Sequence, residues 1–168
     1  MSGGVTRWAA ALVILAGAAG AEDLAFDPGA TLSCLAQSDL NRSGAFDCIG
    51  RSAGACMATP EGGTTVGMGY CLNAEWQWWD ARLNAVYSQL MNGHRAADAE
   101  MARLGIAAPS LADSLQAMQR AWIPFRDAAC DYERATWGNG TGGGPATAGC
   151  LMVQTGRQAL ALESRLGQ

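Results

Sequence analysis

The sequence predicts an all-α protein. We expect a small disulfide-stapled helical bundle with two long helices, a third C-terminal helix and a front section of short helices. Two stretches repeat large apolar residues at steps of three and four, the period of one helix face. Six cysteines, an even number, are typical of disulfide pairing in an exported chain. The first 21 residues resemble a secretory signal peptide, which would take the chain to a compartment where disulfides form.

The first long helix is predicted over residues 70–92. Its large apolar side chains are Leu72, Trp76, Trp79, Leu83, Val86, Tyr87 and Leu90. Gly93 is expected to end this helix in the left-handed conformation that often stops helices, and residues 94–104 are expected to form a separate short helix. Burying one large apolar side chain contributes roughly 1.5–3 kcal/mol, so the rest of the chain is expected to cover this stripe.

The second long helix is predicted to begin at Ser110, which together with Asp113 resembles a capping box. Its apolar stripe consists of Leu111, Leu115, Met118, Trp122, Phe125, Ala129 and Tyr132. Pro124 lies inside the stripe, which leaves two alternatives: one kinked helix, or two helices that meet there. A kink is favoured because the stripe keeps its phase across the proline.

A third helix is predicted over roughly residues 147–166. Arg157 lies on its apolar stripe, and a guanidinium that faces a core requires a carboxylate or several carbonyl partners. Asp80 and Asp127 are candidate partners for it. An exposed position, with the stem of Arg157 on the apolar surface and its charge in water, is an equally good interpretation.

The N-terminal segment predicts export. Arg7 precedes an apolar run over residues 8–19, and the small-residue site 19–21 suits cleavage near Ala21. The run is shorter than the about 20 residues that span a bilayer, although an uncleaved anchor is an alternative. We therefore expect residues 1–21 to be a signal peptide, and the protein to be periplasmic or secreted. The remainder divides into a disulfide-pinned section, residues 22–69, and a helical domain, residues 70–168. Within the first section, residues 31–39 and 45–58 are each expected to form a short helix.

The cysteines are expected to form three disulfides. They are Cys34, Cys48, Cys56, Cys71, Cys130 and Cys150. A zinc site is disfavoured, because there is no C-x-x-C pair and His94 is the single histidine. Cys130 and Cys150 are expected to hold the base of a glycine-rich loop. The other four cysteines allow three pairings, and their spacing does not choose among them.

The charge of the chain argues against nucleic acid as a partner. After cleavage, ten arginines and no lysine face 15 acidic residues, a net charge of −5. Such a balance also disfavours anionic membrane surfaces, whereas it suits a basic protein.

No haem motif is present, and the acidic residues of the predicted helices are of the kind that helix surfaces carry routinely. We therefore expect no catalytic residue, no metal site and no cofactor.

Two features are candidates for binding a protein partner. Trp78 falls about 120° from the centre of the first apolar stripe at 100° per residue, so it either faces a partner or is covered by the front section. Residues 138–145 are rich in glycine, but they lack the G-K-[ST] ending of a phosphate-binding loop. A flexible loop between helices is the better interpretation. Its candidate partner-binding residues are Gly138, Asn139, Gly140 and Thr141.

Three blocks of residues carry a resemblance to a known family. They are Cys71-Leu72-x-x-Glu75-x-x-x-x-Asp80-x-x-Leu83-Asn84-x-x-Tyr87, then Gln119-Arg120-Ala121-Trp122-Ile123-x-x-Arg126-Asp127-x-x-Cys130, and Gly142-Gly143 followed by Cys150 and Thr155-x-Arg157-x-x-x-x-Leu162. In this order and spacing, over roughly residues 56–166, they resemble the lysozyme-inhibitor LprI-like N-terminal domain family. Three blocks together are specific, whereas each alone is weak.

The resemblance implies an exported helical bundle that has no cofactor. It implies that the protein inhibits animal-type lysozyme. It also implies the pairs Cys130–Cys150 and Cys56–Cys71, which leaves Cys34 with Cys48. The motif residues expected to hold the helices together are Asp80, Leu83, Asn84, Tyr87, Trp122, Arg126, Asp127 and Arg157. The predicted function is a non-enzymatic, periplasmic binding protein with a basic lysozyme as its partner. The alternative is a structural or adaptor module of the cell envelope that binds another protein.

Overall fold

Helices make up nearly all of the chain that the computed structural model describes, residues 24–38 and 43–166. In chain order they are α1 (Gly29–Gln37), the 3-10 helix η1 (Ser43–Cys48), α2 (Arg51–Met57), α3 (Thr65–Arg103), α4 (Leu111–Thr136) and α5 (Gly143–Glu163). The predicted all-α, disulfide-stapled bundle is confirmed. The predicted signal peptide, residues 1–21, lies outside the described residues.

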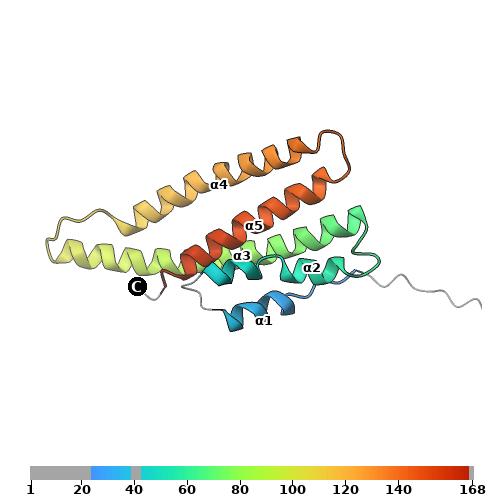
Figure 1. Cartoon of the computed structure of the whole chain (residues 1–168). Coiled ribbons are helices and arrows are strands. Elements are labelled where there is room, and N and C mark those ends of the chain that lie inside the picture. The colour runs from blue at the N-terminus through green and yellow to red at the C-terminus, as the bar shows by residue number, and fades with distance from the viewer. Residues whose placement is uncertain (1–23, 39–42, 167–168) are drawn as a thin grey trace, which may run out of the picture.

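Figure 1 shows three long helices side by side, with α5 between α3 and α4. Residues 104–110 join α3 to α4, and residues 137–142 join α4 to α5. At the end of the bundle where residues 104–110 join them, here called the hairpin end, α3 and α4 extend beyond the end of α5 as a two-helix arm. The short helices α1 and α2 lie on the side of α3 that faces away from α4. The fold therefore leaves the outward side of α4 without a helical neighbour among the described elements.

The core lies where α3 meets α5. The apolar stripe predicted for the first long helix is buried here, with Trp79 at 0% and Leu83 at 2% exposure. From α5, Ala159 and Leu160 are buried against it. Gly156 allows a close approach, because a Cβ atom there would lie 3.0 Å from the Ile49 side chain. The small residues of α5 thus let it pack tightly between larger neighbours.

The first long helix runs further than predicted. Gly93 does not end it, and residues 94–103, expected to form a separate helix, continue α3 to Arg103. The left-handed glycine that follows the helix is Gly105, with φ at 68°. Glycine inside a helix costs only about 1 kcal/mol, and the Ala-rich residues after Gly93 favour helix strongly enough to offset it. No helix in the described part of the chain is both long and apolar enough to cross a bilayer.

Two further boundaries differ from the sequence prediction. Residues 45–58 were expected to form one short helix, but Gly50, at φ 90°, separates η1 from α2. Helix α5 begins at Gly143 rather than near Thr147. Pro145 falls in its first turn, where the missing N–H leaves no helical hydrogen bond unmade. Three residues of the predicted glycine-rich loop therefore belong to the helix.

Helix α4 is continuous across Pro124, so the two-helix alternative is wrong. Its apolar stripe is only partly buried. Ala112, Leu115 and Cys130 are buried, whereas four large stripe residues are exposed. These are Leu111 at 49%, Met118 at 40%, Phe125 at 62% and Tyr132 at 73%. Periodicity identifies the apolar side of a helix, but α5 packs against a neighbouring side.

The start of α4 is fixed by two side chains. Ser110 is the N-cap, and its Oγ accepts a hydrogen bond from the N–H of Asp113 at 3.0 Å. Asp98 on α3 accepts hydrogen bonds from the N–H groups of Leu111 at 2.9 Å and Ala112 at 3.0 Å, and from the Ser110 hydroxyl at 2.8 Å. These bonds, the one from Leu111 foremost, hold the pKa of Asp98 below its usual 3.8.

We predict a pH-dependent effect of Asp98→Asn. Because the folded chain lowers the pKa of Asp98, its carboxylate stabilises the fold fully above the unfolded pKa, and this stabilisation is lost as the pH falls through the folded pKa. The melting temperature of Asp98→Asn should be below that of the wild type at pH 7, and the difference should shrink in acid. Glu133→Gln, on the exposed surface of α4, is the control. A difference that stays constant with pH would contradict the assignment.

Candidate functional site

The most completely buried acidic side chain among the described residues is Glu75 of α3, at 0% exposure. Its Oε1 accepts hydrogen bonds from the Thr31 hydroxyl at 2.9 Å, the Gly50 N–H at 2.8 Å and the Trp79 indole N–H at 3.1 Å. Its Oε2 accepts from the Ala53 N–H at 2.6 Å. The carboxylate thereby joins α1, the start of α2 and α3 through one buried group.

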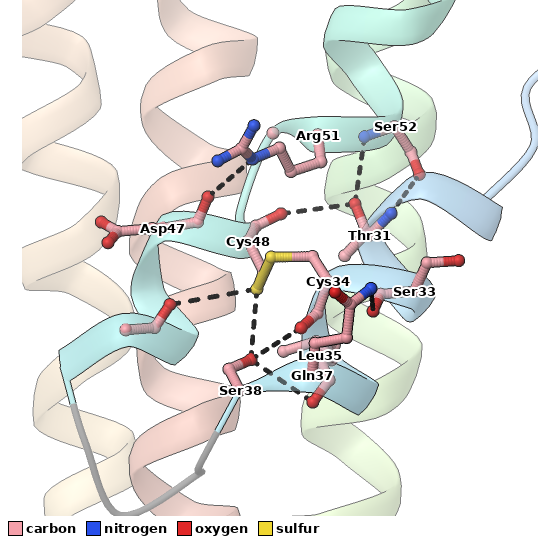
Figure 2. Close-up of a disulfide and its surroundings, with 12 residues drawn as sticks. Thr31, Ser33, Cys34, Leu35, Gln37, Ser38, Asp47, Cys48, Arg51 and Ser52 are labelled. Carbon is pink, nitrogen blue, oxygen red and sulfur yellow. Dashed lines mark hydrogen bonds between the residues drawn. A yellow bond between two sulfur atoms is a disulfide. The ribbon is translucent and has the colours of Figure 1, made fainter.

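Thr31 extends this network into the front section. Its N–H donates to the Ser52 Oγ at 3.0 Å, and the Ser52 N–H donates back to the Thr31 Oγ1 at 3.0 Å. Figure 2 shows this pair beside the Cys34–Cys48 disulfide, with Ser38 on the far side of the sulfur atoms. Polar bonds and one crosslink therefore help to hold α1 in place, beside the packing of Leu35 in the core.

The structure contains three disulfides, Cys34–Cys48, Cys56–Cys71 and Cys130–Cys150. These are the pairs that the family resemblance implies. The first fixes α1 to η1, the second fixes α2 to α3, and the third joins α4 to α5. Each crosslink therefore ties two elements that follow one another in the chain.

The remaining acidic candidates have structural partners. Asp80 accepts a hydrogen bond from the Asn84 side chain at 2.9 Å, and Asp127 pairs with Arg126 at 2.7 Å. Among the described residues, no three histidine, cysteine or acidic side chains gather closely enough to hold a metal ion.

The other motif residues lie at helix contacts or beside them. Leu83 is buried, and Tyr87 and Trp122 are half-buried against the core. The guanidinium of Arg126 stacks over the Trp122 ring, 5.0 Å from its centroid. Arg157 is exposed on α5, which agrees with the open alternative in which its charge stays in water and leaves Asp80 and Asp127 to other partners.

Trp78 is half-buried and already has neighbours. Its ring packs edge-to-face on Trp79, with 4.7 Å between centroids, and Arg82 lies 5.5 Å from its centroid. Arg82 in turn forms a bidentate pair with Glu163 near the end of α5. Part of the Trp78 ring is therefore in contact with Trp79 and Arg82 within the bundle. Its role in binding a partner stays a proposal.

The glycine-rich loop is shorter than predicted and closely packed at one end. Residues 138–141 are exposed, and Gly138 has a φ of 53°. At Gly142, a Cβ atom would lie 2.2 Å from the Trp137 ring, so the loop closes directly onto that ring. The candidate residues Gly138, Asn139, Gly140 and Thr141 lie together at this tip, at the opposite end of α4 from the arm.

Comparison with known proteins decides the family. Residues 56–162 match the model of a family described as lysozyme inhibitor LprI. The chain belongs to the LprI family. It is also 26% identical, over 142 residues, to an uncharacterized 17.7 kDa protein encoded in the puhA 5′ region of Rhodobacter capsulatus, with 80% of this chain and 83% of that protein covered. No solved structure matches the chain.

In this LprI family member the matched region includes two disulfides and excludes most of the front section. Cys56–Cys71 and Cys130–Cys150 lie within the match, whereas Cys34–Cys48 precedes it. Glu75 hydrogen-bonds across the two parts, and the sequence prediction did not place it among the candidate site residues. A signal was present: Glu75 lies three residues after Leu72 and four before Trp79, on the buried stripe.

Proposed function

We propose that this chain is an exported, non-enzymatic binding protein that inhibits lysozyme. The observation that carries the proposal is the match to the lysozyme inhibitor LprI family over residues 56–162. Three crosslinks and the buried Glu75 network support it, because a rigid surface loses little conformational entropy on binding. The disulfides and the signal-like residues 1–21 support a periplasmic or secreted location after cleavage near Ala21.

Charge supports a basic lysozyme as the target. The chain contains no lysine and carries a net charge of −4, which becomes −5 without residues 1–21. An acidic protein attracts a cationic partner over long range and raises the rate of encounter. Charges at the rim of an interface change mainly the association rate, so the apolar contacts of the complex would set most of its dissociation rate.

The test is lysis of bacterial cell walls by lysozyme in a turbidity assay, with purified, oxidised protein lacking residues 1–21. We expect inhibition at micromolar protein. We also expect inhibition to weaken several-fold as ionic strength rises from about 0.01 M to about 0.15 M, because the Debye length falls from about 30 Å to about 8 Å. Normal lysis in low salt with a micromolar excess of the protein would remove the proposal.

An adaptor module of the cell envelope is the second candidate. The exposed apolar side of α4 is compatible with it, because such a surface suits any protein partner, lysozyme included. A pulldown from periplasm separates the two candidates. Recovery of a stable partner other than lysozyme, together with normal lysis in the turbidity assay, would favour the adaptor.

A further inference from the structure

The outward side of α4 is an exposed face without a single charged residue. We call it the outer face, and its positions fall within about 140° of the helix circumference at 100° per residue. Its twelve residues, all of them exposed except the half-buried Ala129, are Leu111, Ser114, Ala117, Met118, Ala121, Pro124, Phe125, Ala128, Ala129, Tyr132, Ala135 and Thr136. A surface helix normally turns charged and polar residues to this side. The outer face is therefore unusual for a helix that meets only water.

Large and small residues alternate along the outer face in a regular order. Leu111, Met118, Phe125 and Tyr132 are spaced seven residues apart, and each is at least 40% exposed. Beside them runs a second seven-residue series of small residues, Ser114, Ala121, Ala128 and Ala135. Over the 26 residues of α4, at 1.5 Å each, the face extends about 39 Å. The large side chains form a ridge and the small ones a groove beside it. A ridge next to a groove is suited to docking against another surface.

The outer face continues into an apolar pocket at the hairpin end. The pocket has a volume of about 480 Å³ and lies between the last turns of α3 and the start of α4. Met101 and Ile106 line it, and Leu111 belongs both to the pocket and to the outer face. Met101 and Ile106 are themselves 41% and 49% exposed. Together the face and pocket form one continuous apolar surface from the arm to the end of α4.

Charge at the edge of this surface distinguishes between possible occupants. Asp113 and Asp131 lie at one edge of the outer face, with Arg120 between them. A second copy of the chain, docked antiparallel so that Leu111 meets Tyr132, would bring Asp113 of one copy beside Asp131 of the other. Both copies would also carry the same net charge of −4. Like charges at an interface cost free energy, whereas a cationic partner gains it.

We propose that the outer face of α4 and the adjoining pocket are the surface that binds the cationic partner, which is lysozyme if the proposed function holds. Phe125 and Tyr132 are the principal contacts, because exposed aromatic side chains bury the largest area and contribute most of the binding energy at interfaces. Leu111 and the pocket receive a protruding apolar side chain of the partner. Asp113 and Asp131 at the edge of the face meet basic groups of lysozyme.

The test compares two double variants of the oxidised protein with the wild type. Phe125→Ser with Tyr132→Ser removes the aromatic contacts of the outer face. Val66→Ser with Tyr70→Ser, at the start of α3, removes two residues that are 84% and 44% exposed on another part of the bundle. Lysozyme binding is measured by calorimetry and inhibition by turbidity. Circular dichroism and thiol titration establish that each variant is folded and oxidised.

We expect the α4 variant to bind lysozyme about 30-fold or more weakly, the loss typical of an interface hot spot, and the α3 variant to bind within about twofold of the wild type. Equal inhibition by wild type and α4 variant would overturn the assignment of the surface and leave the proposed function intact. Absence of inhibition by the wild type would overturn both. Self-association of the wild type that the α4 variant abolishes would show that a second copy occupies the face, which also overturns the proposal.

Discussion

Glu75→Ala is expected to destabilise the protein by about 4 kcal/mol. The substitution leaves three donors without an acceptor: the N–H groups of Gly50 and Ala53 and the Trp79 indole. The Thr31 hydroxyl also loses Glu75 but keeps the Cys48 carbonyl oxygen, at 3.4 Å. Each buried polar group without a partner costs about 1–3 kcal/mol. The lost volume adds a cavity beside Trp79, which is fully buried.

The free energy of unfolding is measured by urea denaturation of the oxidised wild type and variant. Glu61→Ala is the matched control, because Glu61 is exposed in the turn before α3, and it should change stability by less than about 0.5 kcal/mol. A loss below about 1 kcal/mol for Glu75→Ala would contradict the network. Hydrogen exchange localises the effect: α1 and α2 should lose protection first, because Glu75 joins them to α3.

Removal of the Cys130–Cys150 disulfide is expected to cost about 3 kcal/mol. The bond closes a segment with a sequence separation of 20, and on the chain-entropy model such a crosslink restricts the unfolded chain by about that amount. The pair also holds α4 to α5 near their connecting loop. The double variant Cys130→Ala with Cys150→Ala avoids a new polar group at Cys130, which is 1% exposed.

Urea denaturation of this double variant, with the other two disulfides intact, measures the loss. Cys34→Ala with Cys48→Ala provides the comparison, since that bond closes a separation of 14 and should cost a similar amount on the same model. If loss of Cys130–Cys150 leaves stability unchanged, then α5 is held to α4 by packing alone. Peptide mapping of the variant verifies that the remaining cysteines keep their partners.

The two long apolar stripes show what periodicity determines. The stripe of α3 is buried as predicted, because Trp79, Leu83 and their neighbours offer more apolar area than a lone helix can leave in water. The stripe of α4 has the same period, yet Phe125 and Tyr132 are exposed. The pattern of one helix contains no information about which side its neighbour approaches. Which residues of the α4 stripe are buried is therefore determined by where α5 packs.

Helix boundaries were harder to predict than helices. Gly93 and Gly105 are both candidate stops, and only the second has a positive φ. What separates them is context: the residues after Gly93 continue the helix, whereas Ile106 to Pro109 do not. At α5, the glycines before Pro145 resembled a loop by composition, but a first turn tolerates glycine and proline because its N–H groups lack helical partners.

The candidate site was only partly accessible from the sequence. An acid on a buried stripe, as at Glu75, signals a buried acceptor, but its donors come from residues 31, 50 and 53, which no local pattern connects to it. The pairing of the four front cysteines likewise depended on the family resemblance, since spacing alone allows three arrangements. Long-range polar partners are determined by the packed fold as a whole.

Titration of oxidised protein, without residues 1–21, into lysozyme at low ionic strength is the most direct test of the central claim. A binding protein of the proposed kind should give saturable heat with one protein per lysozyme, a micromolar or lower dissociation constant, and parallel loss of lytic activity. No heat, with lysis undiminished at a micromolar excess, would contradict it.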